Sequence, residues 1–340
     1  MSDAHQSLLF FSAQPYDEQF FKRVNKAQNF GFDLKFLNTP LNEHTASLAK
    51  GYECICVFVN DTVDATVIEQ LYEGGTRLVA LRCAGFNNVD LKAAKDKLRI
   101  VSVPAYSPHA VAEYALGLML TANRKYYKAY NRTRGGNFSL NGLLGFDMHG
   151  KTVGIVGTGK IARVLIKLLQ GFDMKLLAYD IYPDEAFAKQ YNVQYTDLQT
   201  LYRQSDIITL HCPLTNDNVH MIDRRAVECM KEGVILINTG RGALIDAKAL
   251  IYGLKKRIVG AAALDVYENE SSYFYRDHSD EIMEDGVLAR LMTFPNVFIS
   301  SHQAFFTREA LTNIAQTTLE SVRAYLNGEP SVNEVKADRS

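Results

Sequence analysis

Three charged or titratable residues each follow an apolar run in the second half of the chain: Arg241 in LINTGRGALID, Glu270 in ALDVYENE and His302 in ISSHQAF. Arginine offers two parallel N–H donors to a carboxylate and polarises a neighbouring carbonyl group. Histidine titrates near neutral pH and can give or take a proton, and a glutamate beside it favours its protonated form. Together these residue types suit the reduction of a 2-oxo acid, which needs a fixed cation, a proton donor and a hydride donor.

Each of these residues alone also has a structural explanation. A histidine at a strand end is more often hydrogen-bonded within the protein than catalytic, and Glu270 lies in a polar, acidic stretch where a charge is usually solvated. Arg241 is harder to explain by stability, because Gly240 and Gly242 would let the backbone turn sharply and leave room beside the chain. Catalysis is therefore predicted from the three residues together, since all of them are expected at the same carboxyl edge of a sheet.

A glycine pattern between an apolar run and a helix-period run predicts a dinucleotide-binding loop at VGIVGTGKIA. Gly157 permits a tight turn, Gly159 lets the backbone approach a pyrophosphate, and the small side chain of Ala162 lets helix and strand pack closely. This spacing alone is weak evidence, because glycine turns between a strand and a helix are common. The loop residues expected to contact the cofactor are Gly157, Thr158, Gly159, Lys160 and Ile161.

Asp180 strengthens this prediction, because it ends the next apolar run 23 residues after Gly157. A carboxylate there can accept hydrogen bonds from both ribose hydroxyls and would repel a 2′-phosphate, which favours NAD over NADP. The alternative is that Asp180 only caps a turn before Pro183. Two further strand ends are expected to complete the cofactor crevice, with the residues His211, Cys212, Pro213, Thr239 and Gly240.

Short apolar runs alternate with helical stretches, which is typical of a mostly parallel α/β sheet with helices on both faces. Strands are expected at residues 8–12, 32–37, 54–59, 77–82 and 99–103, and in a second series at 152–157, 175–180, 206–212, 234–240, 258–266 and 297–302. Between the two series a long helix is expected over residues 106–128, with Ser107 as its cap and Pro108 at its first position. A last helix over residues 307–327 has no partner strand and is expected to pack on the first domain.

Length and composition fit a two-domain protein that acts on small molecules. The chain has 340 residues, 47% of them hydrophobic, and its formal net charge of −1 gives no footprint for nucleic acid or an anionic membrane. Five cysteines without a CxxC pair, and no histidine cluster at metal-ligand spacing, predict reduced thiols and no metal site. No apolar run is long enough for a signal peptide or a membrane span, so a cytoplasmic protein is expected.

Over nearly its whole length the chain resembles the D-2-hydroxyacid dehydrogenase family, and within it the bacterial fermentative NAD-dependent D-lactate dehydrogenases. The resemblance is carried by motifs that include RCAGFNNVDL, YSPHAVAEYALGLML, NRTRGGNFSL, VGIVGTGKIA, INTGRGALID, ALDVYENE and SSHQAF. It implies two Rossmann-like or flavodoxin-like domains with parallel sheets and an active site in the interdomain cleft. Residues 1–104 and 303–340 would form the substrate domain, and residues 105–302 would form the NAD-binding domain.

The resemblance also implies a reaction, the reversible reduction of pyruvate to D-lactate with NADH. Arg241 would bind the substrate carboxylate, His302 would be the acid/base paired with Glu270, and Asp265 would lie near the nicotinamide. The residues expected to bind the small 2-oxo acid are Phe58, Cys83, Ala84, Gly85, Tyr106 and Phe305. A homo-oligomer, either a dimer or a tetramer, is expected to form through the cofactor domains, with the 106–128 helix as a candidate surface.

Two alternatives to this function stay open. One is a D-2-hydroxyacid dehydrogenase with another 2-oxo acid preference, and the other is an NAD-sensing corepressor, a binding protein that shares this fold. The motifs RCAGFNNVDL and NRTRGGNFSL favour an enzyme over a corepressor. Formate dehydrogenases are disfavoured because their relatives carry a glutamine where Glu270 stands. One departure from the family pattern is Tyr114, which occupies a position where histidine is more usual.

Overall fold

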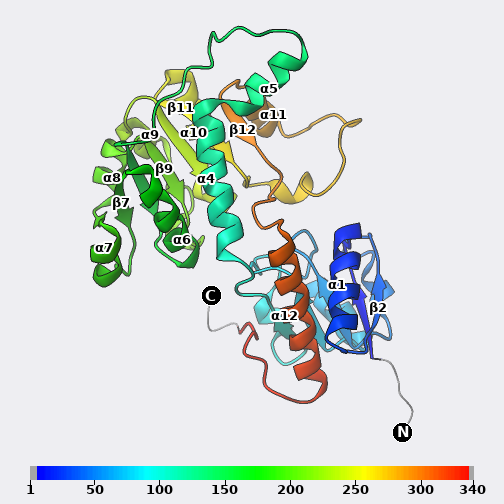
Figure 1. Ribbon diagram of the computed structural model, residues 1–340. Coiled ribbons are helices and arrows are strands. Elements are labelled where there is room, and N and C mark those ends of the chain that lie inside the picture. Colours follow the sequence, from blue (N-terminus) through cyan, green and yellow to red (C-terminus); the bar gives the residue numbers. More distant parts are fainter. Residues whose placement is uncertain (1–5, 337–340) are drawn as a thin grey trace. The chain divides into compact units, whose positions relative to one another are not determined.

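The computed structural model describes residues 6–336. The described chain divides into two compact units, a first unit of residues 6–107 and 306–336 and a second unit of residues 108–305 (Figure 1). Both joins lie three residues later than the boundaries expected from the sequence, at 104 and 302. Each unit contains its own parallel sheet.

The first unit is built on a five-stranded parallel sheet in the order β2-β1-β3-β4-β5. This strand order is that of flavodoxin-like folds, in which ligands bind outside the carboxyl ends of the strands. Every residue of β3 and β4 is buried, as expected for central strands covered on both faces. The strands agree with the predicted runs apart from their ends and are β1 (Ser7–Phe10), β2 (Asp33–Phe36), β3 (Cys54–Val57), β4 (Leu78–Leu81) and β5 (Arg99–Val101).

The last helix of the chain, α12 (Arg308–Leu326), returns to the first unit, which confirms the expectation for residues 307–327. It packs against α1 and β4 and buries Leu311, Ile314 and Leu319. The hydroxyl of Thr307 caps the helix by accepting a hydrogen bond of 3.2 Å from the backbone N–H of Ala310. The other helices of this unit are α1 (Pro15–Ala27), η1 (Ala46–Ala49), α2 (Ala65–Glu73) and α3 (Leu91–Ala94).

The second unit is built on a seven-stranded parallel sheet in the order β12-β11-β10-β9-β6-β7-β8. Strand order reverses on the two sides of β6, which is the switch point where Rossmann sheets bind dinucleotides. The sequence pattern does not predict β8, because this edge strand has three residues and buries only Val193. The strands are β6 (Thr152–Val156), β7 (Lys175–Tyr179), β8 (Val193–Tyr195), β9 (Ile207–Leu210), β10 (Val234–Asn238), β11 (Val259–Leu264) and β12 (Val297–Ile299).

Two hydrophobic cores cover the two faces of this sheet. On one face α4 and α6 pack together and bury Met119 and Leu165, and on the other face α8, α9 and α10 bury Leu201, Val227 and Leu250. The helices are α4 (Pro108–Arg124), α5 (Tyr126–Arg134), α6 (Lys160–Leu169), η2 (Gln170–Phe172), α7 (Glu185–Tyr191), α8 (Leu198–Gln204), η3 (Asn216–Asn218), α9 (Arg224–Cys229), η4 (Gly242–Leu244), α10 (Ala247–Lys256), η5 (Glu270–Ser272) and α11 (Gly286–Met292).

The single helix expected over residues 106–128 is wrong, because the chain breaks it at Lys125. This residue has a φ of 54°, in the left-handed region, which cannot continue a right-handed helix. α4 therefore ends at Arg124, and α5 begins at Tyr126 and leads into the long loop at the top of Figure 1.

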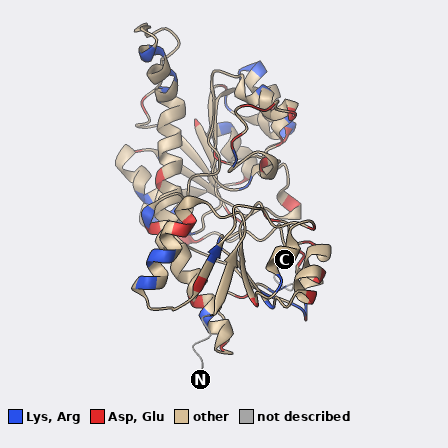
Figure 2. Cartoon of the chain, turned by 90° about the vertical axis from the view of Figure 1, so that its right-hand side faces the viewer, with Lys and Arg blue, Asp and Glu red and all other residues tan. Residues whose placement is uncertain are grey.

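Positions of charged residues of both signs are distributed over the helices and loops, in line with the net charge of −1 (Figure 2). Within residues 6–336, no helix combines the length and the apolar character needed to cross a membrane. All five cysteines carry free thiols.

Candidate active site

Arg241, Glu270 and His302 follow three strands that are neighbours in the second sheet. β10 pairs with β11, and β11 pairs with β12, in parallel. Because the carboxyl ends of parallel strands meet at one edge of a sheet, the loops that carry the three residues leave the sheet at the same edge. This confirms the expectation of a shared edge.

Glu270 and His302 form a hydrogen-bonded pair. Nδ1 of His302 lies 2.6 Å from Oε1 of Glu270, and Oε2 of Glu270 accepts a hydrogen bond of 3.0 Å from the backbone N–H of Tyr267. The two side chains are 20% and 21% exposed, so the pair is shielded but reachable. Within the described residues Nε2 of His302 has no hydrogen-bond partner, which leaves this ring atom for a ligand.

The loop that carries His302 is held by Asp265, which is fully buried. The backbone carbonyl of Asp265 accepts a hydrogen bond of 2.7 Å from the N–H of His302. Its carboxylate accepts hydrogen bonds from the hydroxyl of Ser300 and from the N–H groups of Gln303 and Ala304, at 2.7, 2.9 and 2.9 Å. Asp265 is thus a positioning residue for the imidazole, and its expected place near the nicotinamide stays a prediction.

His302 has an unusual backbone conformation, with a φ of 53°. Residues other than glycine seldom adopt this left-handed region, and they do so at a cost of about 1–3 kcal/mol when the surrounding structure imposes it. Here the surroundings are the hydrogen bonds from residues 300–304 to Asp265. The loop therefore holds the imidazole in one orientation against a local backbone preference.

The guanidinium of Arg241 has no acidic partner within residues 6–336. The residue is half-buried, and Nη1 donates one hydrogen bond of 2.9 Å to the carbonyl of Gly240. A cation in a partly desolvated place gains strongly from an anion that approaches it. Arg241 is therefore well suited to bind the carboxylate of a ligand.

The glycines beside Arg241 are required by space rather than by backbone conformation. The chain bends at residues 239–240, but neither Gly240 nor Gly242 has a positive φ, so the bend alone does not require glycine there. A Cβ on Gly242 would lie 2.0 Å from the backbone carbonyl carbon of Tyr267. Gly242 is required because the loop after β10 and the loop after β11 touch through their backbones.

Asn238, the last residue of β10, is a further positioning residue that sequence reasoning missed. Its Nδ2 donates a hydrogen bond of 2.9 Å to the carbonyl of Arg241, and its Oδ1 accepts one of 3.0 Å from the N–H of Gly240. The side chain is fully buried, so these bonds are shielded from water. Its signal in the sequence is a polar residue that closes an otherwise apolar strand.

The predicted dinucleotide loop joins β6 to α6. Gly157 has a φ of 89°, and a Cβ there would lie 2.6 Å from the backbone nitrogen of Cys212, so only glycine fits. A Cβ on Gly159 would meet no atom within 4 Å, which leaves open space beside the first turn of α6. Gly159 offers no side-chain cap, so the N–H groups at this helix end are available to an anion. Ala162 is fully buried, as close helix packing requires.

Asp180 follows β7 and contacts the glycine loop. Its Oδ2 accepts hydrogen bonds from the N–H and the hydroxyl of Thr158 at 2.6 and 2.8 Å, and its Oδ1 accepts one of 2.9 Å from the N–H of Tyr182. Burial would raise the pKa of Asp180, but these hydrogen bonds outweigh burial and lower it, so the carboxylate is ionised at neutral pH. The turn-capping role is confirmed, and Oδ1 keeps acceptor capacity for a ribose hydroxyl.

The other residues predicted for the cofactor crevice follow β9 and β10, which lie next to β6 in the sheet. Burial lowers the pKa of His211 to about 4, so its ring, 2.9 Å from the hydroxyl of Thr209, is neutral. Oγ1 of Thr239 is buried without a hydrogen-bond partner. A bound cofactor would supply the missing partner. Cys212, Pro213 and Gly240 continue the same two loops.

The residues predicted to bind the substrate are divided between the units. Phe58 follows β3, residues 83–85 follow β4, and Tyr106 follows β5, so they gather at the carboxyl edge of the first sheet. Phe305 belongs to the second unit. Phe58, Cys83 and Phe305 are buried, and the substrate contacts of this set stay predictions.

Arg82 and Asp61 contact the loops that carry the predicted substrate residues of the first unit, and sequence reasoning missed both. Nη2 of Arg82 donates a hydrogen bond of 2.8 Å to the carbonyl of Ser12, its Nε lies 3.2 Å from Oδ1 of Asp17, and its guanidinium lies 4.8 Å from the centre of the Phe58 ring. Oδ2 of Asp61 accepts a hydrogen bond of 2.6 Å from the N–H of Phe58. Both charged side chains are buried, and the signal for Arg82 is a charge directly after the apolar run LVAL.

Tyr114, the departure from the family pattern, gives α4 a contact with the loop that carries His302. Nε2 of Gln303 donates a hydrogen bond of 2.6 Å to the hydroxyl of Tyr114. Burial raises the pKa of Tyr114, so the phenol stays protonated at neutral pH.

Comparison with known proteins identifies the family in which this site occurs. Residues 116–304 match the model of the D-isomer specific 2-hydroxyacid dehydrogenase, NAD binding domain. The chain belongs to the D-isomer specific 2-hydroxyacid dehydrogenase family. This confirms the family that the sequence motifs suggest.

Members of this family are similar to the chain over almost its full length. D-lactate dehydrogenase of Escherichia coli K12 is 50% identical over 329 residues, which cover 96% of this chain and 99% of that protein. The apo structure of D-lactate dehydrogenase from Escherichia coli has a TM-score of 0.88 at 48% identity. The structure of the pyruvate reductase of Chlamydomonas reinhardtii has a TM-score of 0.91 at 41% identity, and both structural comparisons cover 97% of this chain and 99% of the other.

The family model also names the cofactor of the second unit, which is NAD. The residues present fit this cofactor in three ways. The first turn of α6 has free N–H groups beside open space at Gly159, the buried hydroxyl of Thr239 lacks a partner, and Asp180 is ionised. These groups would hold the pyrophosphate and the adenosine ribose of a 2-hydroxyacid dehydrogenase cofactor.

Asp265→Asn tests the positioning role of the buried carboxylate. The amide has one acceptor oxygen instead of two, so one of the three donors from residues 300–304 loses its partner. We expect kcat to fall by about tenfold or more and the free energy of unfolding to fall by about 1–3 kcal/mol. Steady-state kinetics and thermal unfolding measure the two effects. The exposed Asp280→Asn is the matched control, and a normal kcat in Asp265→Asn would remove this role.

The ionised carboxylate of Asp180 predicts a strong preference for NADH over NADPH. A 2′-phosphate beside this carboxylate places two negative charges together, so kcat/KM with NADPH is expected to be about 100-fold lower. Asp180→Ser is expected to lower the ratio of kcat/KM with NADH to kcat/KM with NADPH. Asp173→Ser, at a side chain that is 85% exposed, should leave this ratio unchanged. Equal efficiency of the unmodified protein with both cofactors would refute the assignment.

Proposed function

We propose that the protein is an NAD-dependent D-lactate dehydrogenase, which reduces pyruvate to D-lactate with NADH and also catalyses the reverse oxidation. The observation that carries this proposal is the 2.6 Å contact between His302 and Glu270 on an NAD-binding domain. The unpaired guanidinium of Arg241 follows the neighbouring strand. The names of the relatives, a D-lactate dehydrogenase and a pyruvate reductase, support the choice of substrate.

Arg241 binds and polarises the substrate in this proposal. Its two-pronged guanidinium matches the two oxygens of a carboxylate, and the same group lies beside the 2-oxo carbonyl of a bound pyruvate. The hydrogen bond from Asn238 to the carbonyl of Arg241 fixes the backbone from which the side chain extends. The carboxylate of the substrate thereby gains both charge neutralisation and a defined orientation.

His302 supplies the proton. When bound, NADH would supply the hydride that the carbonyl carbon accepts, and NAD⁺ would take the hydride in the reverse direction. Nε2 of His302 gives its proton to the carbonyl oxygen. Glu270 accepts a hydrogen bond from Nδ1, so it fixes the tautomer and stabilises the imidazolium before transfer. In the oxidation direction, the neutral Nε2 takes the hydroxyl proton of D-lactate.

We further propose that the protein is a homo-oligomer that associates through the segment 126–144 rather than through α4. Most apolar residues of α4 are buried within the second unit. Large apolar side chains exposed on a monomer commonly mark an interface with another chain, and a second copy is the occupant proposed here. The exposed apolar side chains of the segment, which are 53–87% exposed, are Tyr126, Tyr130, Phe138, Leu140 and Leu144.

The five free thiols support the cytoplasm as the compartment of this enzyme.

The central test is a steady-state panel with NADH and five 2-oxo acids, namely pyruvate, 2-oxobutyrate, oxaloacetate, phenylpyruvate and hydroxypyruvate. We expect the highest kcat/KM with pyruvate, and chiral chromatography is expected to show D-lactate as the product. A clear preference for another acid would assign a different 2-hydroxyacid dehydrogenase. NADH binding without turnover of any acid would instead indicate a binding protein of the corepressor kind.

Arg241→Lys tests the carboxylate site, because lysine keeps the charge and loses the two-pronged geometry. The KM for pyruvate is expected to rise by about 10- to 100-fold, since one charge-assisted hydrogen bond is lost. The exposed Arg257→Lys serves as the control and should keep the normal KM. A normal KM in Arg241→Lys would show that Arg241 lies outside the site.

Glu270→Gln tests the pairing with the imidazole through the rate of pyruvate reduction. The amide has nearly the shape of the carboxylate but no charge, so Nδ1 of His302 loses its charged acceptor and the proton donor loses its support. We expect kcat to fall by about 100-fold, within the range attributed to a general acid. The exposed Glu284→Gln is the control, and a normal kcat in Glu270→Gln would contradict the pairing.

A further inference from the structure

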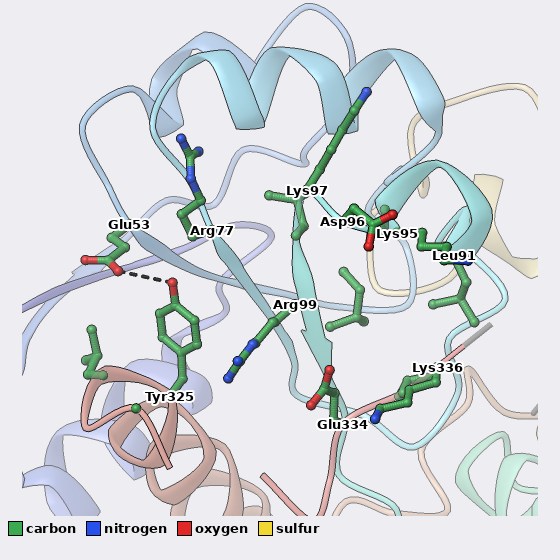
Figure 3. Close-up of a pocket in the computed structure, with 16 residues that line it drawn as sticks. Glu53, Arg77, Leu91, Lys95, Asp96, Lys97, Arg99, Tyr325, Glu334 and Lys336 are labelled. Atoms are coloured by element: carbon green, nitrogen blue, oxygen red, sulfur yellow. Dashed lines mark hydrogen bonds between the residues drawn. The ribbon is translucent and has the colours of Figure 1, made fainter. Parts of the chain in front are cut away.

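A hollow lies in the first unit, at the edge of the sheet opposite to the predicted substrate residues. It has a volume of about 670 Å³, which lies within the range of small-molecule sites (Figure 3). Glu53 and Arg77 directly precede β3 and β4, and Arg99 is the first residue of β5. These residues mark the amino ends of the strands, whereas Phe58 and Cys83 follow the carboxyl ends. The hollow is therefore separate from the substrate residues of this unit.

Positive charge dominates the lining of this hollow. It contains three carboxylates, from Glu53, Asp96 and Glu334. Five cationic side chains from three separate stretches of the chain outnumber them, and they are Arg77, Lys95, Lys97, Arg99 and Lys336. A concave surface lined by one excess charge raises the local concentration of counter-ions.

The cations are not neutralised by the carboxylates of the hollow. Lys97 pairs with Glu69 on α2, outside the lining. Within residues 6–336, the side chains of Lys95, Arg99 and Lys336 form no ion pair. The guanidinium of Arg99 lies 5.6 Å from the centre of the Tyr325 ring, a contact that leaves its N–H donors unused.

The aromatic and apolar parts of the lining are fixed. The hydroxyl of Tyr325 donates a hydrogen bond of 3.1 Å to Oε1 of Glu53, which joins the end of α12 to the start of β3. Leu98 and Ile100 are buried beneath the hollow. The C-terminal segment is attached to β5, because the N–H of Val335 donates a hydrogen bond of 2.9 Å to the carbonyl of Ile100. The lining thus combines a wall held by hydrogen bonds with cationic side chains, three of which form no ion pair within the described residues.

We propose that this hollow is a second binding site, for a small polyanionic metabolite that is either a polycarboxylate or an organic phosphate. Two or more negative charges on one ligand would engage Lys95 and Arg99 of one segment together with Lys336 of another. Such a ligand would clamp the C-terminal segment to β5 and stabilise the first unit. This site takes no part in the proposed reduction, and it neither needs nor supplies the catalytic residues.

Isothermal titration calorimetry of the NADH-saturated protein tests the proposal, with citrate as the polycarboxylate probe and inorganic pyrophosphate as the phosphate probe. Because bound NADH occupies the predicted anion site at α6, binding of a probe at that site does not contribute to the measured heat. We expect saturable binding of one of the probes with one site per chain. Lys95→Gln, Arg99→Gln and Lys336→Gln combined should raise its Kd by about tenfold or more, because charge-assisted hydrogen bonds are lost. Lys92→Gln, at an exposed lysine outside the lining, should leave Kd unchanged.

Three results would overturn the proposal. The first is no saturable heat with either probe up to about 10 mM, a concentration that covers weak metabolite sites. The second is equal binding by the triple variant, which would identify an adventitious ion only. The third is loss of the heat in Arg241→Gln, which would place the probe in the catalytic site. Pyruvate reduction by the triple variant is expected to be normal. Absence of probe binding would therefore not contradict the proposed dehydrogenase function. Conversely, a protein that binds citrate but does not reduce pyruvate would support this site and contradict the proposed function.

Discussion

The buried carboxylate of Asp265 is the constraint on which the geometry of the second unit depends. Asp265 directly follows β11, which lies between β10, the strand before Arg241, and β12, the strand before His302. Its N–H donates a hydrogen bond of 2.9 Å to the carbonyl of Asn238, and its carboxylate and carbonyl hold the loop of His302. Removing a carboxylate from water is unfavourable, and the three hydrogen bonds that it accepts offset this cost. One buried acid therefore links both loops that carry the chemistry.

In the proposed reaction, one group keeps its charge throughout and another changes its charge. Arg241 keeps its charge at every physiological pH, so it can serve as a permanent anchor for a carboxylate. His302 changes its charge during the reaction, and for this it needs a partner that tolerates both states. Glu270 accepts a hydrogen bond from Nδ1 whether Nε2 is protonated or not. The backbone N–H of Tyr267 in turn donates a hydrogen bond to Glu270 and orients its carboxylate toward His302.

Sequence patterns predict what depends on periodicity, and they miss what depends on tertiary hydrogen bonds. The shared edge of Arg241, Glu270 and His302 is predictable, because each follows an apolar run and parallel strands end together. The roles of Asn238, Asp265 and Arg82 are not predictable from local sequence, because their partners lie on other strands or in distant loops. The break at Lys125 is missed because its neighbours keep helical spacing while its own φ is 54°. The contact that requires glycine at position 242 is also not predictable, because the close approach of two backbones has no local signature in the sequence.

The contact at Gly242 has a consequence for how this enzyme can diversify. With a Cβ position 2.0 Å from the carbonyl carbon of Tyr267, the loops after β10 and β11 already touch at the level of the main chain. No side chain stands between them that substitution could enlarge or trim. The main chain therefore fixes the spacing between the loop of Arg241 and the loop of Glu270, the partner of the proton donor. Substitutions that change the size of the accepted substrate have to act on residues elsewhere in the chain.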